Sequence, residues 1–188
     1  MGIRWINVNL SPNQFMSRNV PERFESILKE YGVSPDRIHL ELTEQSMIDF
    51  SLMQEQIRAL HEAGFEFALD DYGSGYSNVN NLIRYSPRYV KIDRQLISGI
   101  HTNAQKQHFV KSIIAYAKNN EILTLAEGVE TMEELRTVIS LGADLVQGYY
   151  TGYPASDPID KITEEVSAQI RRFHHDRENN ALVVENAF

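Results

Sequence analysis

The chain has 188 residues, of which 42% are hydrophobic and 23% are charged, and it contains no cysteine. This length corresponds to about one domain with a hydrophobic core. The formal net charge of −8 argues against non-specific binding to nucleic acids or membrane surfaces, and the lack of cysteine excludes disulfides, thiolate metal sites and a cysteine nucleophile. No apolar run approaches a membrane span and no signal-like segment opens the chain, so we expect a soluble, cytoplasmic domain.

Short β-rich stretches alternate with amphipathic helical stretches along the chain. Six strands are predicted, at Ile3–Leu10, Arg37–Thr43, Phe65–Asp70, Tyr89–Asp93, Glu121–Glu127 and Ala143–Gln147. Helices are predicted at Pro21–Tyr31, Leu52–Ala63, Ala104–Asn119, Met132–Leu141 and Pro158–Phe173, with a further short helix before Tyr89. Connections of this length require parallel strands and hence an α/β fold. We expect one domain over residues 1–173 and a C-terminal tail, 174–188, that is a mobile end or a strand used elsewhere.

The positions of polar residues favour one of two α/β folds, the doubly wound sheet and the barrel. Each predicted strand has polar side chains at or just past its C-terminal end, namely Asn9, Glu41, Asp70 with Asp71, Lys91 with Asp93, Glu127 and Gln147. In a barrel these ends all meet at one mouth, whereas in an open sheet only those at the switch point meet. We therefore predict a TIM-type (β/α) barrel. A complete barrel typically needs about 250 residues, so six units indicate an incomplete barrel that is about two units short.

The oxygen atoms of these side chains suit a hard divalent cation. Carboxylates and an amide favour Mg²⁺ or Mn²⁺, whereas zinc usually takes His or Cys ligands. The adjacent Asp70 and Asp71 could bridge two metals, as in phosphodiester hydrolysis, and Lys91 could orient or deprotonate a water or hold a phosphate. Each residue alone also fits a structural role, such as a turn, a surface ion pair or a strand end. Their occurrence at six successive strand ends favours a functional site.

The same residues lie in motifs that resemble the EAL-domain phosphodiesterases, which linearise the bacterial second messenger cyclic di-GMP to pGpG. The six motifs occur in order between about Ile6 and Pro158. They are Asn9-Leu-Ser, Glu41-Leu-Thr-Glu44, Asp70-Asp71-Tyr-Gly-Ser-Gly75-Tyr-Ser, Lys91-Ile-Asp93, Glu127-Gly-Val-Glu130 and Gln147-Gly-Tyr. Six separate motifs in the family's order make the resemblance highly specific.

The resemblance implies a site for two cations, Mg²⁺ or Mn²⁺, and cyclic di-GMP as the partner. The implied metal ligands are Asn9, Glu41, Asp70, Asp71 and Glu127, with Asp70 shared between the metals. Lys91 would lie beside the attacking water, Gln147 would help to place the water or the metal shell, and Glu44 would brace the loop that couples dimerisation to metal binding in this family. Implied substrate-binding or supporting positions are Asp93, Glu130, Gly73, Gly75 and Tyr76.

The sequence departs from the family near its beginning. Only eight residues precede Asn9, and no Glu-Ala-Leu motif occurs among them. In the family this motif supplies a metal-ligating Glu, followed downstream by an Arg that helps to hold the substrate. The resemblance therefore implies that the first units of the barrel are missing. We therefore expect weak metal binding and slow hydrolysis. We also expect exposed strand edges, which favour a homodimer or a higher oligomer.

Three hypotheses about function remain open. The first is a cyclic di-GMP phosphodiesterase domain. The second is a catalytically degenerate EAL-like module that binds cyclic di-GMP or a protein partner without turnover. The third, from the residues alone, is another metal-dependent barrel enzyme, such as an enolase-type proton abstractor with a lysine base. None of them involves a DNA or RNA polymer or insertion into a membrane.

Overall fold

The computed structural model describes residues 4–15, 17, 19–43, 50–74, 82–83, 85–157 and 161–185. The chain forms two compact units, Met1–Lys91 and Ile92–Phe188. Each unit combines parallel strands with the helices that connect them. Glu41, Asp70 and Lys91 belong to the first unit, and Glu127 and Gln147 belong to the second.

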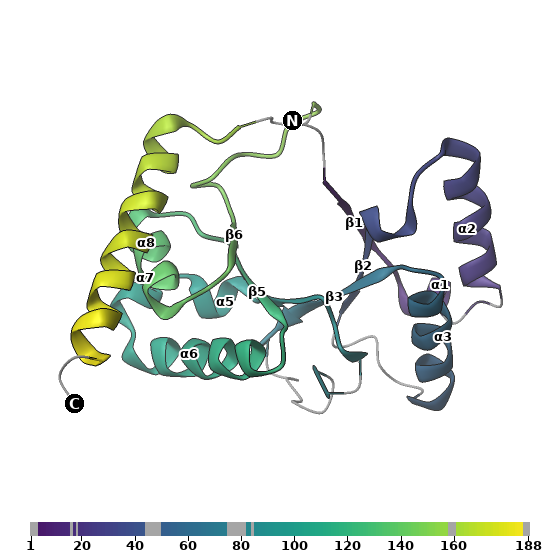
Figure 1. Ribbon diagram of the computed structural model, residues 1–188, viewed down its shortest axis with the longest axis horizontal. Helices are drawn as coiled ribbons and strands as arrows, with labels where there is room; N and C mark the ends of the chain where they lie inside the picture. The colour runs from purple at the N-terminus through teal and green to yellow at the C-terminus, as the bar shows by residue number, and fades with distance from the viewer. Residues whose placement is uncertain are drawn as a thin grey trace. The chain divides into compact units, whose positions relative to one another are not determined.

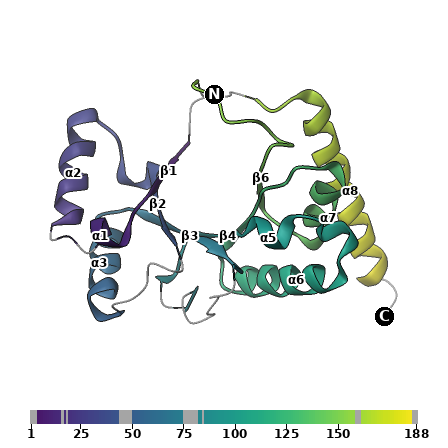
Figure 2. The ribbon, with the colours of Figure 1, turned by 180° about the vertical axis from the view of Figure 1, so that it is seen from behind.

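The first unit is a parallel sheet with helices on one face (Figure 1). Its strands follow one another in chain order as β1 (Ile6–Asn9), β2 (Ile38–Thr43), β3 (Glu66–Tyr72) and β4 (Tyr89–Ile92), the last of which reaches the unit boundary. Its helices are α1 (Pro12–Phe15), α2 (Val20–Tyr31) and α3 (Phe50–Glu62), with the 3₁₀ turn η1 (Pro35–Arg37) before β2. Figure 2 shows α2 and α3 together beside the strands, and the two helices contact each other.

The alternation of side chains along the strands separates the hydrophobic core from the candidate site. Leu40 and Leu42 of β2 are buried in a core with Phe67 of β3 and Leu60 of α3. Because successive strand residues point to opposite faces, Glu41 points away from this core, toward the face that the helices leave uncovered. The alternation that turns the apolar side chains of β2 toward the helices thus also turns Glu41 toward the opposite face of the sheet.

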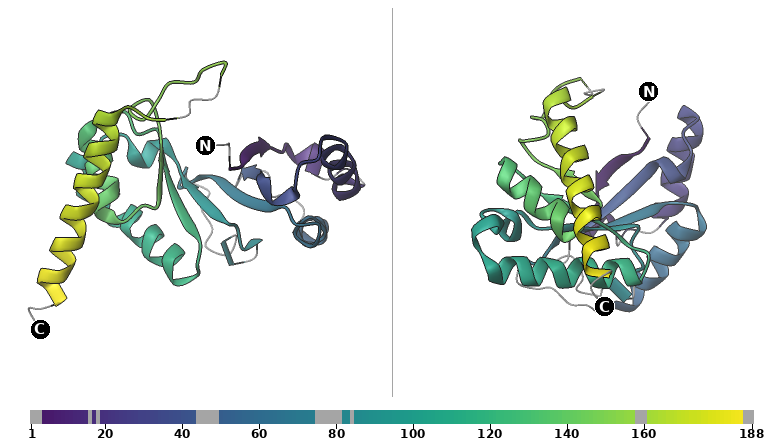
Figure 3. Two further views of the ribbon diagram at one scale, coloured as in Figure 1. Left: turned by 45° about the horizontal axis from the view of Figure 1, so that its top comes forward. Right: turned by 60° about the vertical axis from the view of Figure 1, so that its left-hand side comes forward.

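The second unit contains two parallel strands, β5 (Leu123–Glu127) and β6 (Leu145–Gln147). Its helices are α5 (Arg94–Ile97), α6 (Ala104–Asn119), α7 (Met132–Leu141) and α8 (Glu164–Glu185), with the 3₁₀ turn η3 (Ile100–Thr102). Side chains cap the starts of α6 and α7, where Asn103 accepts a hydrogen bond from the Lys106 N–H and Thr131 accepts one from the Glu134 N–H. Helices α7 and α8 lie side by side in both views of Figure 3.

The observed elements confirm most of the predicted ones, and the main difference lies at the C-terminus. Helices α6 and α7 have the predicted bounds. Helix α8 does not end at Phe173 but continues to Glu185, so the predicted helix end was wrong and residues 174–185 do not form a strand. The alternative that the tail is a mobile end stays a prediction. No Gly or Pro interrupts the chain over this stretch, so the backbone can stay helical where the apolar pattern fades. The domain division at residue 173 stays a prediction.

Two short helices, α1 and α5, were not predicted, because four residues are too few to show a helical period. Strand β3 runs two residues further than predicted and so includes Asp71. Among the described residues, none of the helices is both long enough and apolar enough to cross a membrane.

Candidate functional site

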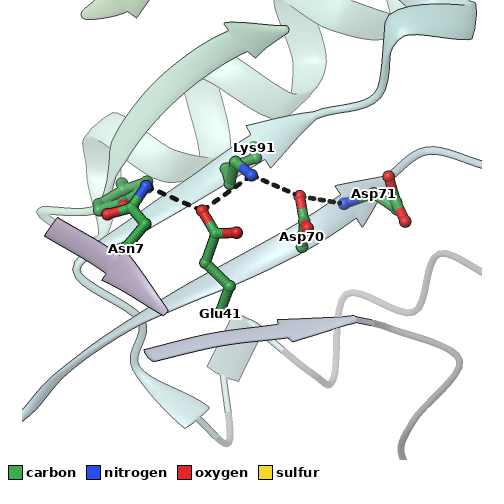
Figure 4. A network of polar contacts seen from close by, with 6 residues as sticks. Asn7, Glu41, Asp70, Asp71 and Lys91 are labelled. Atoms are coloured by element: carbon green, nitrogen blue, oxygen red, sulfur yellow. Dashed lines mark hydrogen bonds and ion pairs between the residues drawn. The ribbon is translucent and has the colours of Figure 1, made fainter. Parts of the chain in front are cut away.

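A continuous polar network crosses the four neighbouring strands of the first unit (Figure 4). The Lys91 ammonium group lies 2.9 Å from Glu41 Oε1 and 2.8 Å from Asp70 Oδ1. The Asn7 Nδ2 group donates a hydrogen bond of 2.8 Å to the same Glu41 oxygen. The backbone N–H of Asp71 donates to Asp70 Oδ1 over 3.1 Å. The contacts of Lys91 and Asn7 join side chains that are far apart in the sequence, and each uses one oxygen of the carboxylate.

The centre of the network is shielded from water. The side chains of Lys91 and Glu41 are each 6% exposed, and that of Asp70 is 14% exposed. Charges in such surroundings lose hydration and depend on their partners, so removal of one member leaves the others uncompensated. The ammonium group therefore holds two buried carboxylates close together that would otherwise repel each other.

A buried phenol extends the network at β4. The Tyr89 hydroxyl donates a hydrogen bond of 2.6 Å to Asn7 Oδ1, and Tyr89 is only 1% exposed. Burial raises the pKa of Tyr89 to about 12, and the nearby negative charge of Glu41 acts in the same direction. The phenol is therefore protonated at neutral pH and serves as a hydrogen-bond donor.

A layer of aromatic rings lies next to this network. The His39 ring stacks on Trp5 with centroids 5.2 Å apart and meets the Tyr89 ring at 5.5 Å. Burial lowers the pKa of His39, against the opposing charge of Glu66. His39 is thus a neutral packing residue beside the site at neutral pH.

The end of β3 brings two aspartates together in an unusual backbone conformation. Asp71 has a φ of 55°, in the left-handed region that residues other than glycine seldom occupy, and Gly73 follows with a φ of 103°. Such conformations cost energy and occur preferentially at functional sites. In Figure 4 the side chains of Asp70 and Asp71 both lie at this strand end.

The second unit aligns two more of the predicted site residues. Glu127 and Gln147 are the last residues of β5 and β6 and are direct partners in the parallel register. Asp93 accepts a hydrogen bond of 2.6 Å from the Gln95 N–H and so caps α5, and Glu130 forms an ion pair of 2.8 Å with Arg94. Asp93 and Glu130 thus hold local structure next to strand ends.

The structure therefore brings together Glu41, Asp70, Asp71 and Lys91 in one unit and Glu127 with Gln147 in the other. Asn9 is exposed on β1 but is the register partner of Glu41. Glu41 and Asp70 lie two residues before the last residues of β2 and β3, so the prediction that they lie at or just past the strand ends needs this correction. The roles assigned to these residues stay predictions.

Three of the sequence-predicted residues, Glu44, Gly75 and Tyr76, lie outside the described residues. Conversely, Asn7, Tyr89 and Glu134 were not predicted, although each has a sequence signal. Asn7 and Tyr89 precede Asn9 and Lys91 by two residues and so share their faces of the sheet. Glu134 occupies the third position after Thr131, as in a capping box.

The donor chemistry of the first unit fits a divalent metal ion. Glu41, Asp70 and Asp71 carry three formal negative charges and Lys91 carries one positive charge, which leaves a formal charge of about −2 when the carboxylates are ionised. Carboxylate oxygens are the ligands that Mg²⁺ and Mn²⁺ prefer. A divalent cation would balance the remaining charge.

Comparison with known proteins identifies the family. Residues 1–154 match the EAL domain family, and the chain belongs to it. The chain is 35% identical over 149 residues to the probable cyclic di-GMP phosphodiesterase PdeA of Escherichia coli, covering 79% of this chain and 20% of PdeA. It is 30% identical over 147 residues to the cyclic di-GMP phosphodiesterase RocR of Pseudomonas aeruginosa, covering 78% of this chain and 38% of RocR.

A solved structure supports the same assignment. Klebsiella pneumoniae BlrP1, in its complex with calcium and cyclic di-GMP, matches with a TM-score of 0.81 and 32% identity over 86% of this chain and 41% of BlrP1. This likeness confirms the predicted fold class, an α/β fold of the incomplete (β/α) barrel type. The chain spans 20% of the length of PdeA and 38% of that of RocR, so it corresponds to one part of these longer relatives.

Proposed function

We propose that the chain acts as an EAL-type cyclic di-GMP phosphodiesterase domain, which hydrolyses cyclic di-GMP to the linear dinucleotide pGpG with the help of divalent cations. The observation that carries this proposal is the buried contact of Lys91 with Glu41 and Asp70 in a member of the EAL family. The complex of BlrP1 with cyclic di-GMP supports the choice of substrate. Because this substrate is a bacterial second messenger, we place the domain in the cytoplasm.

Asn9, Glu41 and Asp70 of the first unit would hold one cation, and Asp71 would be a ligand of the second cation, which Asp70 would share. Glu127 is the corresponding ligand proposed in the second unit. BlrP1 has been solved with calcium and with manganese, which supports a hard divalent cation in this family. When bound, such cations stabilise charge on a phosphate and lower the pKa of bound water.

The other polar groups would orient the reactants. The Lys91 ammonium group would hold a phosphate oxygen or the attacking water through charge-assisted hydrogen bonds. The Gln147 amide, which has both donor and acceptor atoms, would place water at the end of β6. Because the centre of the network excludes water, these contacts would be stronger than the same contacts in solution.

One observation favours a second function, binding without turnover. Lys91 already compensates Glu41 and Asp70, so the site has partners for its carboxylates before any metal binds. A protein with this arrangement could bind cyclic di-GMP or a protein partner while its metal sites stay weak. Tight binding of cyclic di-GMP without formation of pGpG would select this function.

The test is to incubate the purified chain with cyclic di-GMP and Mn²⁺ or Mg²⁺ and to follow pGpG by chromatography. We expect that Asp70→Asn abolishes turnover and that Asp157→Asn preserves it. The control removes the same charge at an exposed position of the second unit that takes no part in the network. Turnover that survives in Asp70→Asn would contradict the proposed role of this carboxylate. Formation of pGpG in the presence of a metal chelator would contradict the requirement for a divalent cation.

A further inference from the structure

We propose that Tyr89 and Asn7 are positioning residues that hold the Glu41 carboxylate in the orientation required for cation binding. This inference rests on the proposed function, in which Glu41 is a metal ligand. It follows from two consecutive hydrogen bonds, from the Tyr89 hydroxyl to Asn7 Oδ1 (2.6 Å) and from Asn7 Nδ2 to Glu41 Oε1 (2.8 Å). Neither residue belongs to the motifs that resemble the family.

Tyr89 provides the fixed end of this chain of contacts. Its ring is fully buried and packs against His39, which leaves the hydroxyl little freedom to move. Because burial raises its pKa to about 12, the phenol keeps its proton at any ordinary pH. Tyr89 is thus a rigid hydrogen-bond donor at a defined position.

The orientation of the Asn7 amide is determined at both of its ends. An ionised carboxylate only accepts hydrogen bonds, so the NH₂ group of Asn7 must face Glu41 and its oxygen must face a donor. The Tyr89 hydroxyl is that donor. Asn7 lies on the exposed strand β1, where an amide without this contact would be free to turn toward water. The phenol therefore keeps the amide aimed at Glu41.

Asn7 holds Glu41 in a way that Lys91 cannot. Both residues donate to Glu41 Oε1, but Lys91 is positively charged and also binds Asp70. A divalent cation near Glu41 would repel the ammonium group, whereas the neutral amide would not be repelled in this way. Asn7 is therefore the contact that can persist when a metal ion binds.

The test measures Mn²⁺ affinity by electron paramagnetic resonance in the wild-type chain and in Asn7→Ala, Tyr89→Phe and the double variant. Loss of a residue that orients a metal ligand typically weakens metal binding by about tenfold or more, and we expect this for Asn7→Ala. We expect a smaller loss for Tyr89→Phe. The double variant should bind Mn²⁺ as Asn7→Ala does, because Tyr89 acts through Asn7.

A matched control separates positioning from general destabilisation. Asn103→Ala removes an amide of the same type that caps α6, outside the network, so it should lower stability and leave the Mn²⁺ affinity unchanged. An equal loss of affinity in Asn103→Ala would overturn the inference, as would additive losses in the double variant.

Failure of the inference can be distinguished from failure of the proposed function. In one outcome the wild-type chain binds Mn²⁺ and Glu41→Gln abolishes this binding, but Asn7→Ala and Tyr89→Phe bind Mn²⁺ as the wild type does. The inference is then wrong, while the proposed function stands. If the folded wild-type chain binds no Mn²⁺, both are wrong.

Discussion

At the scale of single residues, Lys91 is the group on which the candidate site depends. Its ammonium group lies between Glu41 and Asp70, and all three side chains are largely buried. Replacing all members of a buried ion pair by apolar residues often changes the stability of the protein little. Replacing only one member lowers the stability strongly, because it leaves a buried charge without its partner. The stability of the first unit therefore depends on the positive charge of Lys91 beside these two carboxylates.

Replacement of Lys91 by methionine should destabilise the metal-free protein by about 3–5 kcal/mol, because two carboxylates are left buried without their cation. Urea denaturation in the presence of a chelator measures this loss. Mn²⁺ should raise the unfolding temperature of Lys91→Met more than that of the wild type, since it replaces the missing charge. Lys111→Met, at an exposed position on α6, should change stability by less than about 0.5 kcal/mol. Equal stabilities of Lys91→Met and wild type would contradict this account.

The residues that sequence analysis missed show what a linear pattern lacks. Glu41, Asp70 and Lys91 could be predicted because each lies in a strand with a recognisable motif. Asn7 and Tyr89 are 82 residues apart in the sequence and lie on different strands, and only the arrangement of the sheet brings their side chains together. The pattern fixes the face on which each residue lies, but not the neighbour that it meets across the sheet.

At the scale of secondary-structure elements, Glu134 joins the start of α7 to the turn before η3. Its carboxylate accepts hydrogen bonds from the N–H groups of Gly99, Glu130 and Thr131 at 2.8, 2.9 and 3.1 Å. Burial alone raises the pKa of Glu134, but these hydrogen bonds outweigh it and hold the pKa below its ordinary value. The capping glutamate is thus also a tertiary contact within the second unit.

Glu134→Gln should destabilise the protein by about 2 kcal/mol at neutral pH, because hydrogen bonds to a charged group are stronger than those to an amide. A carboxylate with a lowered pKa in the folded state stabilises the fold above its unfolded pKa, near 4.5, and this stabilisation is lost as the pH falls through the lower folded value. The stability difference should therefore shrink below about pH 4. Urea denaturation at several pH values tests this, with the exposed neighbour Glu133→Gln as the control. A difference that does not depend on pH would argue against the charged contact.

Element prediction succeeded where a helix buries a continuous apolar face. Helices α6 and α7 carry such faces and caps, and their predicted bounds were confirmed. Beyond Phe173 the apolar pattern fades, so the sequence indicated no helix where α8 continues. Helical propensity without an amphipathic pattern gives too weak a signal to set a boundary.

At the scale of the whole molecule, the alternation of strands and helices was enough to predict an α/β fold of the barrel type, and the likeness to BlrP1 confirms it. The alternation works because parallel strands need long connections, which helices supply. The homodimer or higher oligomer expected from the sequence stays a prediction. Strand β1 stands at one end of the strand order, and Trp5 and Ile6 expose 38% and 49% of their surface there.

We expect sedimentation velocity to show a dimer, because an exposed strand edge with apolar side chains tends to pair with another chain. Ile6→Lys should shift the protein toward the monomer, since charge on an edge strand disfavours pairing. Ile162→Lys, at a position of similar exposure before α8, should leave the dimer unchanged. A wild-type chain that sediments as a monomer at micromolar concentration would contradict the prediction.

The most direct test of the central claim is a single measurement of pGpG formation by the folded chain in cyclic di-GMP and Mn²⁺. Circular dichroism would establish folding, and Asp70→Asn would provide the blank. We predict that the wild type forms pGpG and that the variant does not. Folded wild-type protein that binds Mn²⁺ and cyclic di-GMP but forms no pGpG would contradict the claim that this chain is a phosphodiesterase.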